Sequence, residues 1–170
     1  MQNIKNILIA FDGSDQAMDA LIYVSRFFPP DKTRVHLFHV AVDAPEAVID
    51  LRKDSEDRYT TVSISAWADT IQQNLTAAFT KAASVLKKAG FPENAVKSTY
   101  HRCNHGVARD IIAESRMDYD LLVFGRNGLS RLEHVVIGSV ANKLLSAADH
   151  LPLIAVGGCP QADKILIGID

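Results

Sequence analysis

Two short glycine segments, separated by nine residues, form the part of the sequence whose residue types and spacing suggest chemistry. They are Gly125-Arg-Asn-Gly128 and Gly138-Ser139-Val140. Gly128 allows either a positive φ or a close approach that a side chain would block. Gly138 and Ser139 precede a helical pattern, and the first amides of a helix have no partner within it and carry the positive end of its dipole. We therefore predict that bare backbone amides of both segments bind an anion, most plausibly a phosphate.

Length and composition restrict the classes of protein to be considered. The chain has 170 residues, a net charge of −2 and two cysteines. This charge gives no basic surface for nucleic acid or for an anionic membrane, and no apolar run reaches the roughly 20 residues of a membrane helix. Two cysteines are too few for a disulfide scaffold. We expect a cytoplasmic domain without a signal peptide that binds neither nucleic acid nor membrane.

The pattern of apolar residues alternates between strands and helices. Short apolar runs predict strands over residues 6–11, 35–40, 95–102, 121–124 and 153–156. Helical spacing follows the first strand, with Ser14 as a good N-cap, and returns after residues 67, 107 and 139. Strands that alternate with helices predict a parallel α/β sheet with right-handed crossovers.

The connection after the second strand is long and has no sustained period. Residues 41–66 carry mixed charge and are predicted to form a loop, either as a lid over a ligand or as a solvated surface segment, with at most a helical turn at 47–51. A long helix is expected next, with Trp67, Ile71, Leu75, Phe79, Ala82 and Leu86 on one face. Gly90 and Pro92 should end it.

The last seven residues repeat the pattern of the first strand. Residues 6–12 read Asn-Ile-Leu-Ile-Ala-Phe-Asp, and residues 164–170 read Lys-Ile-Leu-Ile-Gly-Ile-Asp. We interpret 1–158 as one domain and 159–170 as a linker and the first strand of a second, truncated copy. The alternative is a sixth strand with a generic apolar pattern.

Together with Asp12 after the first strand and the β-α order, the glycine motif resembles the universal stress protein family over about residues 4–157. Glycine-x2-glycine-x9-glycine-serine is the ATP-binding signature of that family. The resemblance implies an α/β fold with an open parallel five-stranded sheet in the order 3-2-1-4-5 and helices on both faces. This fold is Rossmann-like, of the adenine nucleotide alpha hydrolase-like type. Its ligand site is expected where the strand order reverses.

The same resemblance implies roles for individual residues. The phosphates would be held by Gly125, Arg126, Asn127, Gly128, Gly138, Ser139 and Val140. Asp12 would lie near the ribose or near a Mg²⁺ bound to the phosphates, and Val40 would meet adenine through its main chain, with Ala10 nearby.

Alternatives remain for several of these residues. The glycines could serve turn and helix contacts without any ligand, and Asp12 could cap the first helix. Arg126 could clamp the phosphates or point to solvent.

Histidines and a cysteine raise the question of a metal site. His101, Cys103 and His105 alternate along the chain, as metal ligands on one face of a strand would, but no fourth ligand is evident. A strand end and a helix start explain them as well. His36 and His39 should lie on opposite faces of the second strand and are interpreted as structural.

Three functions are compatible with these features. The first is an ATP-binding stress-response module whose shape or partner depends on nucleotide. The second is a slow Mg²⁺-dependent ATPase that uses Asp12, and the third is a dimerising adapter that no longer binds nucleotide. The family resemblance also implies a homodimer through the fifth strand, near residues 153–156, or an equivalent pairing with a second domain.

Overall fold

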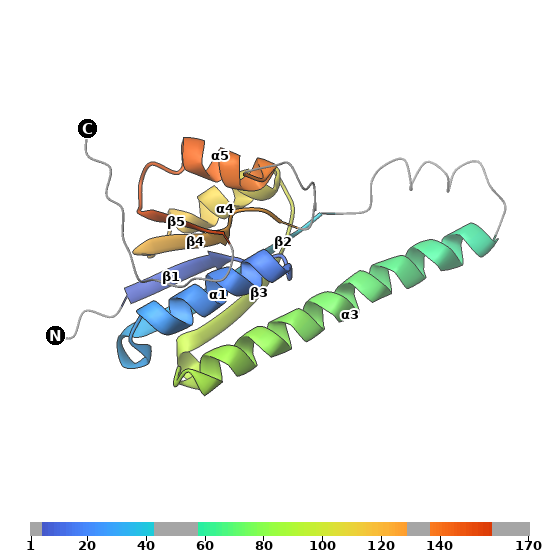
Figure 1. Ribbon diagram of the computed structural model, residues 1–170. Coiled ribbons are helices and arrows are strands. Elements are labelled where there is room, and N and C mark those ends of the chain that lie inside the picture. Colours follow the sequence, from blue (N-terminus) through green and yellow to red (C-terminus); the bar gives the residue numbers. More distant parts are fainter. Residues whose placement is uncertain (1–4, 43–57, 129–136, 158–170) are drawn as a thin grey trace.

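A single parallel sheet organises the protein (Figure 1). The structure is a computed structural model that describes residues 5–42, 58–128 and 137–157. Its strands are β1 (Lys5–Ala10), β2 (Thr33–Ala41), β3 (Val96–Arg102), β4 (Leu121–Gly125) and β5 (Leu153–Val156). They lie in the order β3-β2-β1-β4-β5, and every neighbouring pair is parallel. The predicted fold class and strand order are confirmed.

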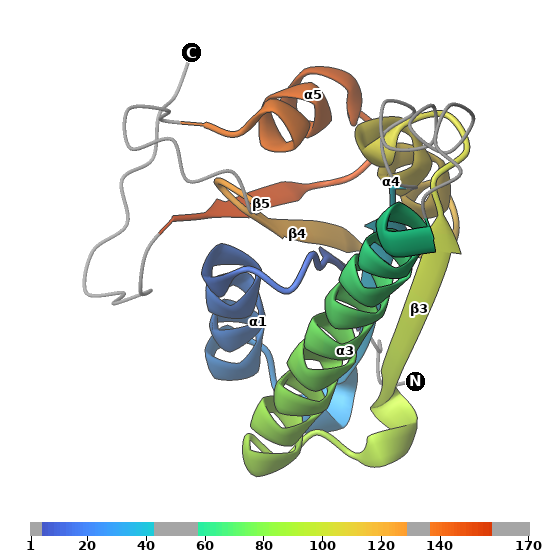
Figure 2. The same cartoon turned by 90° about the vertical axis from the view of Figure 1, so that its right-hand side faces the viewer.

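Helices cover both faces of this sheet, as Figure 2 shows. The described residues form the α-helices α1 (Asp15–Phe27), α3 (Arg58–Lys88), α4 (Val107–Ser115) and α5 (Ser139–Ala147). Two short 3-10 helices, Pro30–Lys32 and Glu93–Ala95, precede β2 and β3. α1 contacts α3 on one face, and α4 contacts α5 on the other. Each face of the sheet is therefore buried beneath its own pair of helices.

The two faces hold separate hydrophobic clusters, because successive strand residues point to opposite sides. Ile7 and Ile9 of β1 lie with Leu21 of α1 and Leu86 of α3 in one cluster. Leu8, between them, lies in the other cluster, whose further members include Phe38, Ile111, Leu122 and Leu144. The central strands are apolar on both sides, which explains the continuous apolar runs of the sequence.

Local signals set the ends of the first helix and of the long one. The Ser14 hydroxyl accepts the Ala17 N–H at 3.1 Å, as its N-cap position predicts. Gly90 has a φ of +93°, which a glycine adopts without strain, and the Phe91 N–H returns to the Leu86 carbonyl at 3.0 Å. This arrangement ends α3 and turns the chain toward β3.

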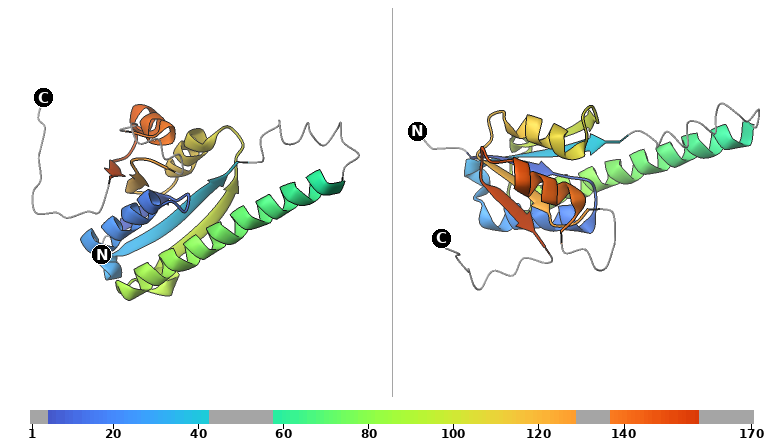
Figure 3. Two further views of the ribbon diagram at one scale, coloured as in Figure 1. Left: turned by 45° about the vertical axis from the view of Figure 1, so that its right-hand side comes forward. Right: turned by 90° about the horizontal axis from the view of Figure 1, so that it is seen from above.

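α3 is longer than the sequence indicated. Its 31 residues correspond to about 46 Å of helix, and the N-terminal part extends beyond the sheet (Figure 3). The prediction of a loop through residue 66 is therefore wrong for 58–66, where β-branched and small residues obscured the helical period. The expected buried face is confirmed at Leu75, Ala82 and Leu86, with Phe79 partly buried. The side chains of Trp67 and Ile71 are not among those that the structure describes. The predicted turn at 47–51 and the C-terminal repeat lie outside the described residues.

Candidate functional site

A cavity of about 350 Å³ opens at the carboxyl ends of the strands, where the chain order reverses between β1 and β4. This is where open α/β sheets bind their ligands. It is lined by Ala10, Phe11, Asp12, Ala17, Phe38, His39, Val40, Val42, Val107, Ile111, Phe124, Gly125, Asn127, Gly128, Gly138, Ser139, Val140, Ala141 and Leu144. The volume and the largely apolar walls suit a small organic ligand.

The sequence-predicted site residues meet at this cavity, with one exception. The two glycine segments, Asp12 after β1, Ala10 and Val40 all contribute to its lining. They come from three strand ends and the start of α5, so residues separated by more than a hundred positions become neighbours. Arg126 is not among the lining residues.

Arg126 instead joins the glycine loop to the edge of the sheet. Its N–H donates to the Val156 carbonyl at 2.7 Å, and its own carbonyl accepts the Gly138 N–H at 2.9 Å. A Cβ placed on Gly157 would lie 2.9 Å from the Arg126 Nε, so the side chain runs over Gly157. Arg126 is exposed and does not line the cavity, and its side chain also lies beside Gly157.

The expectation of bare amides therefore needs a correction. The Arg126 and Gly138 N–H groups are already bonded within the protein and are not available to a ligand. The start of α5 behaves as predicted: Gly138 is its N-cap with extended backbone and provides no side-chain cap. The N–H groups of Ser139 and Val140 belong to the first turn and have no acceptor within the helix. They are donors that the site can offer an anion.

Both glycines of the first segment closely approach other parts of the chain. A Cβ on Gly125 would lie 2.8 Å from the main-chain carbon of Gln16 in α1. A Cβ on Gly128 would lie 2.8 Å from Oδ2 of Asp12. Gly128 is not among the glycines with positive φ, so the second of its two predicted roles holds.

Asp12 connects the first helix with the glycine loop. Its Oδ1 accepts the Ser14 N–H at 3.0 Å, so the carboxylate does stabilise the turn before α1, as the capping alternative supposed. Its Oδ2 faces Gly128. The two roles are compatible because a carboxylate has two oxygens, and Asp12 carries the only carboxylate among the described lining residues.

Much of the cavity wall consists of residues that no sequence motif identified. Phe38 and Phe124 line it from β2 and β4, and Val107 and Ile111 line it from α4. Val107 and Ile111 are four residues apart, so a helix places them on one face. Their spacing was visible in the sequence, but only the crossing of α4 over the sheet shows that this face lies beside the glycine loop.

His39 was interpreted as structural, yet it also lines the cavity. Its Nδ1 lies 2.9 Å from the Phe11 carbonyl, at the residue before Asp12. Burial lowers the pKa of His39, while the Phe11 carbonyl and the nearby charge of Asp12 act in the opposite direction.

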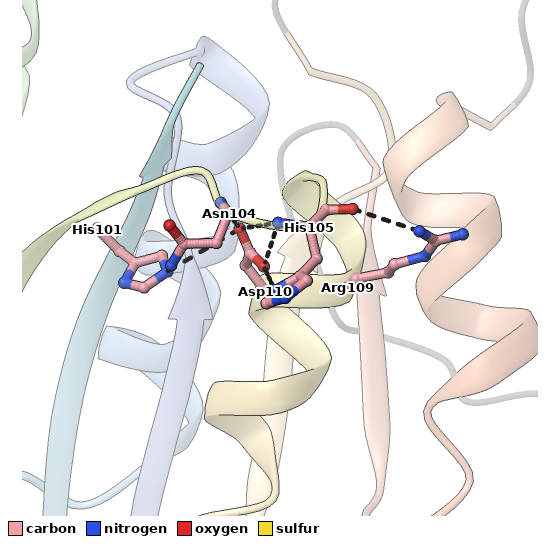
Figure 4. Close-up of polar contacts among 5 residues, drawn as sticks. All are labelled: His101, Asn104, His105, Arg109 and Asp110. Atoms are coloured by element: carbon pink, nitrogen blue, oxygen red, sulfur yellow. Dashed lines mark hydrogen bonds and ion pairs between the residues drawn. The ribbon is translucent and has the colours of Figure 1, made fainter. Parts of the chain in front are cut away.

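The two histidines of the potential metal set, His101 and His105, lie beside the carboxylate of Asp110 instead (Figure 4). Asp110 is 4% exposed and accepts the N–H groups of Asn104 at 2.7 Å and His105 at 3.1 Å. His105 Nδ1 lies 3.4 Å and His101 Nε2 3.9 Å from its oxygens. These hydrogen bonds, led by that of Asn104, lower the pKa of Asp110. No group of three ligands suited to a metal is present in the described parts of the chain.

His36 is structural, as predicted. It is 5% exposed, its Nε2 lies 2.7 Å from Thr99 Oγ1, and its Nδ1 is bonded to the Tyr119 hydroxyl. That hydroxyl donates to Glu114 Oε1 at 2.6 Å. A neutral imidazole satisfies both contacts, because its Nδ1–H can donate to the Tyr119 hydroxyl while its Nε2 accepts from Thr99. Burial, followed by the charge of Lys97, lowers the pKa of His36.

The fold and the cavity define a class of protein. An open parallel sheet in the order 3-2-1-4-5, with a cavity and a helix N-terminus at the point of reversal, is a doubly wound α/β domain of the kind that binds small ligands there. The model of the universal stress protein family matches residues 3–156. The chain belongs to this family.

Solved structures agree with this fold. The universal stress protein UspA from Lactobacillus plantarum has 17% identity and a TM-score of 0.67, with 91% of this chain and 98% of that chain covered. A universal stress protein from Archaeoglobus fulgidus in complex with dAMP has 15% identity and a TM-score of 0.56, with coverage of 91% and 98%. A universal stress protein in complex with cAMP has 18% identity and a TM-score of 0.55, with coverage of 89% and 96%.

No curated protein sequence matches this chain. Among the described residues, no helix combines the length and the apolar character needed to cross a bilayer.

Proposed function

We propose that this protein is a cytoplasmic, ATP-binding universal stress protein whose shape or partner depends on the bound nucleotide. One observation carries the proposal: the cavity at the strand-order reversal is lined by both glycine segments and by Asp12. Adenine would occupy the apolar end beside Val40 and Ala10. The phosphates would meet the Gly128 loop and the first turn of α5.

The chemistry of the two ends supports this orientation. Phe38, Val107 and Ile111 offer apolar surface to a base, and a main-chain edge at Val40 can pair with its polar atoms. The N–H groups of Ser139 and Val140, the Ser139 hydroxyl and the α5 dipole favour an anion at the other end. The complexes with dAMP and cAMP show that proteins of similar fold accept adenine nucleotides.

A Mg²⁺ ion fits the same arrangement. Oxygen ligands suit Mg²⁺, which commonly binds one or two carboxylates together with substrate phosphates. Oδ2 of Asp12 is the carboxylate oxygen that faces the Gly128 loop. When bound, the ion would neutralise phosphate charge next to Asp12, which would otherwise repel it.

The direct test is to identify the nucleotide that accompanies the purified protein. Protein purified under native conditions is denatured, and the released small molecules are identified by mass. Stripped protein is then titrated with Mg-ATP by calorimetry, with Asp12→Asn as the matched variant, since it keeps the shape and removes the charge. We expect released adenine nucleotide and weaker Mg-ATP binding by the variant. Protein that releases no nucleotide and also ignores added Mg-ATP would disprove the proposal.

A pairing of sheets is proposed in addition. β5 is an edge strand, and its residues 153–155 are not fully buried, so its outer side can accept another strand. We propose that two copies, or residues 1–158 and a second domain of the same family, pair along this edge. Sedimentation equilibrium should show dimers, and a monomer at high concentration would contradict a homodimer.

A further inference from the structure

His39 holds the turn that carries Asp12. The imidazole sits at the end of β2, and its Nδ1 lies 2.9 Å from the carbonyl oxygen of Phe11. The ring of Tyr100, at 5.3 Å between centroids, and that of Phe79, at 6.5 Å, flank it. The side chain is thus held between β3 and α3 while it lines the cavity.

The identity of the acceptor determines which nitrogen carries a proton. A backbone carbonyl only accepts hydrogen bonds, so Nδ1 of His39 must be the N–H donor. The bond persists whether the ring is neutral or protonated, because protonation takes place at Nε2. His39 is therefore a permanent donor to Phe11 and not a pH-controlled one.

Phe11 follows the last residue of β1, and both of its main-chain groups are bonded to β2. Its N–H donates to the Phe38 carbonyl at 2.9 Å, and its carbonyl accepts from His39. The second bond fixes the peptide plane that joins Phe11 to Asp12. Among the described residues no main-chain N–H donates to this carbonyl, since the ladder between β1 and β2 ends at Ala10 and Phe38.

We propose that His39 is a positioning residue of the nucleotide site: by fixing the Phe11 carbonyl it orients the Asp12 carboxylate toward the Gly128 loop. This inference rests on the proposed nucleotide binding. Oδ2 of Asp12 lies so close to Gly128 that a Cβ there would be 2.8 Å away, and a small rotation of the preceding peptide would move that oxygen. His39 would act through Asp12 on the phosphate end and not on the base.

A purely space-filling role makes a different prediction. If the ring served only to fill the space between Tyr100 and Phe79, phenylalanine would replace it without effect on the ligand. If the Nδ1–H is what matters, asparagine would replace it, because its side-chain amide nitrogen occupies a similar position and can donate to the same carbonyl.

The experiment compares His39→Phe with His39→Asn at pH 8, where the imidazole is neutral. Calorimetry measures the affinities for Mg-ATP and for adenosine. Adenosine has no phosphates and no bound metal, so its binding does not depend on Asp12. Thermal unfolding measures the stability of each variant. His39→Phe should weaken Mg-ATP binding by about tenfold, the scale of one lost hydrogen bond, while adenosine binding changes by less than about threefold. His39→Asn should restore Mg-ATP affinity to within about threefold of the wild type.

The outcomes separate this inference from the proposed function. Wild-type protein that binds neither ligand overturns both. If the wild type binds Mg-ATP, two results overturn only the role of His39. In the first, His39→Phe binds Mg-ATP as tightly as the wild type does. In the second, His39→Phe loses affinity for Mg-ATP and for adenosine to the same extent. If His39→Phe fails to fold, His39→Leu takes its place, because leucine also lacks the donor and is smaller. The loss of Mg-ATP affinity relative to the loss of adenosine affinity then tests the role of His39.

Discussion

Gly125→Ala should lower the stability of the protein, whereas Gly128→Ala should mainly lower its affinity for Mg-ATP. Both substitutions would place a Cβ 2.8 Å from an existing atom. At Gly125 the neighbours are the main-chain carbon and oxygen of Gln16, at 2.8 and 2.9 Å, together with its Cβ. These atoms belong to the first turn of α1 and cannot rotate away. At Gly128 the neighbour is the terminal oxygen of Asp12, which can.

The magnitudes follow from this difference. Gly125→Ala forces β4 and α1 apart, and overpacking of this kind costs about 1–3 kcal/mol. For a chain of this size the cost corresponds to a fall of roughly 2–12 °C in melting temperature. Gly128→Ala meets no unfavourable φ, so the cost of moving the carboxylate is offset by the lower entropy of the unfolded chain, and stability should change by less than about 1 kcal/mol. Its Mg-ATP affinity should fall by about tenfold, because Oδ2 of Asp12 is displaced.

Urea unfolding followed by circular dichroism measures the first effect, and calorimetric titration with Mg-ATP measures the second. An unchanged denaturant slope would show that the midpoints can be compared directly. The reasoning would be refuted if Gly125→Ala unfolded at the wild-type midpoint. It would also be refuted if Gly128→Ala lost as much stability as Gly125→Ala while keeping its nucleotide affinity.

Two further predictions concern buried and half-buried polar groups. The folded-state pKa values of His36 and His39 are lowered, so the unfolded chain takes up protons near its ordinary pKa of about 6.5 before the folded chain does. Stability should therefore be level above about pH 7 and fall as the pH drops below 6.5, and a urea midpoint that rose on acidification would contradict this sign. Tyr119→Phe removes the hydroxyl between His36 and Glu114 and should cost about 1–3 kcal/mol in urea unfolding, whereas Tyr23→Phe, with no such network, should cost little.

Much of the fold was readable from local signals. The continuous apolar runs predicted the central strands because a strand covered on both faces has no polar side. Ser14 and Gly90 marked a helix start and a helix end through their own chemistry, and both positions are confirmed. The long helix was recognised from residue 67 onward, where the sequence shows a helical apolar period, and Leu75, Ala82 and Leu86 of that face are buried. Residues 58–66 have no clear apolar period in the sequence and were assigned to a loop.

The candidate site was only partly contained in the sequence. Spacing identified the glycine segments, and the family resemblance added Asp12. The structure brings these residues together at one cavity. Whether an amide is free, whether Arg126 faces a ligand and whether His39 supports the turn depend on atoms from distant parts of the chain. Only the tertiary structure decides these points, since hydrogen bonds form between neighbours in space and one-dimensional spacing does not specify which neighbours those are.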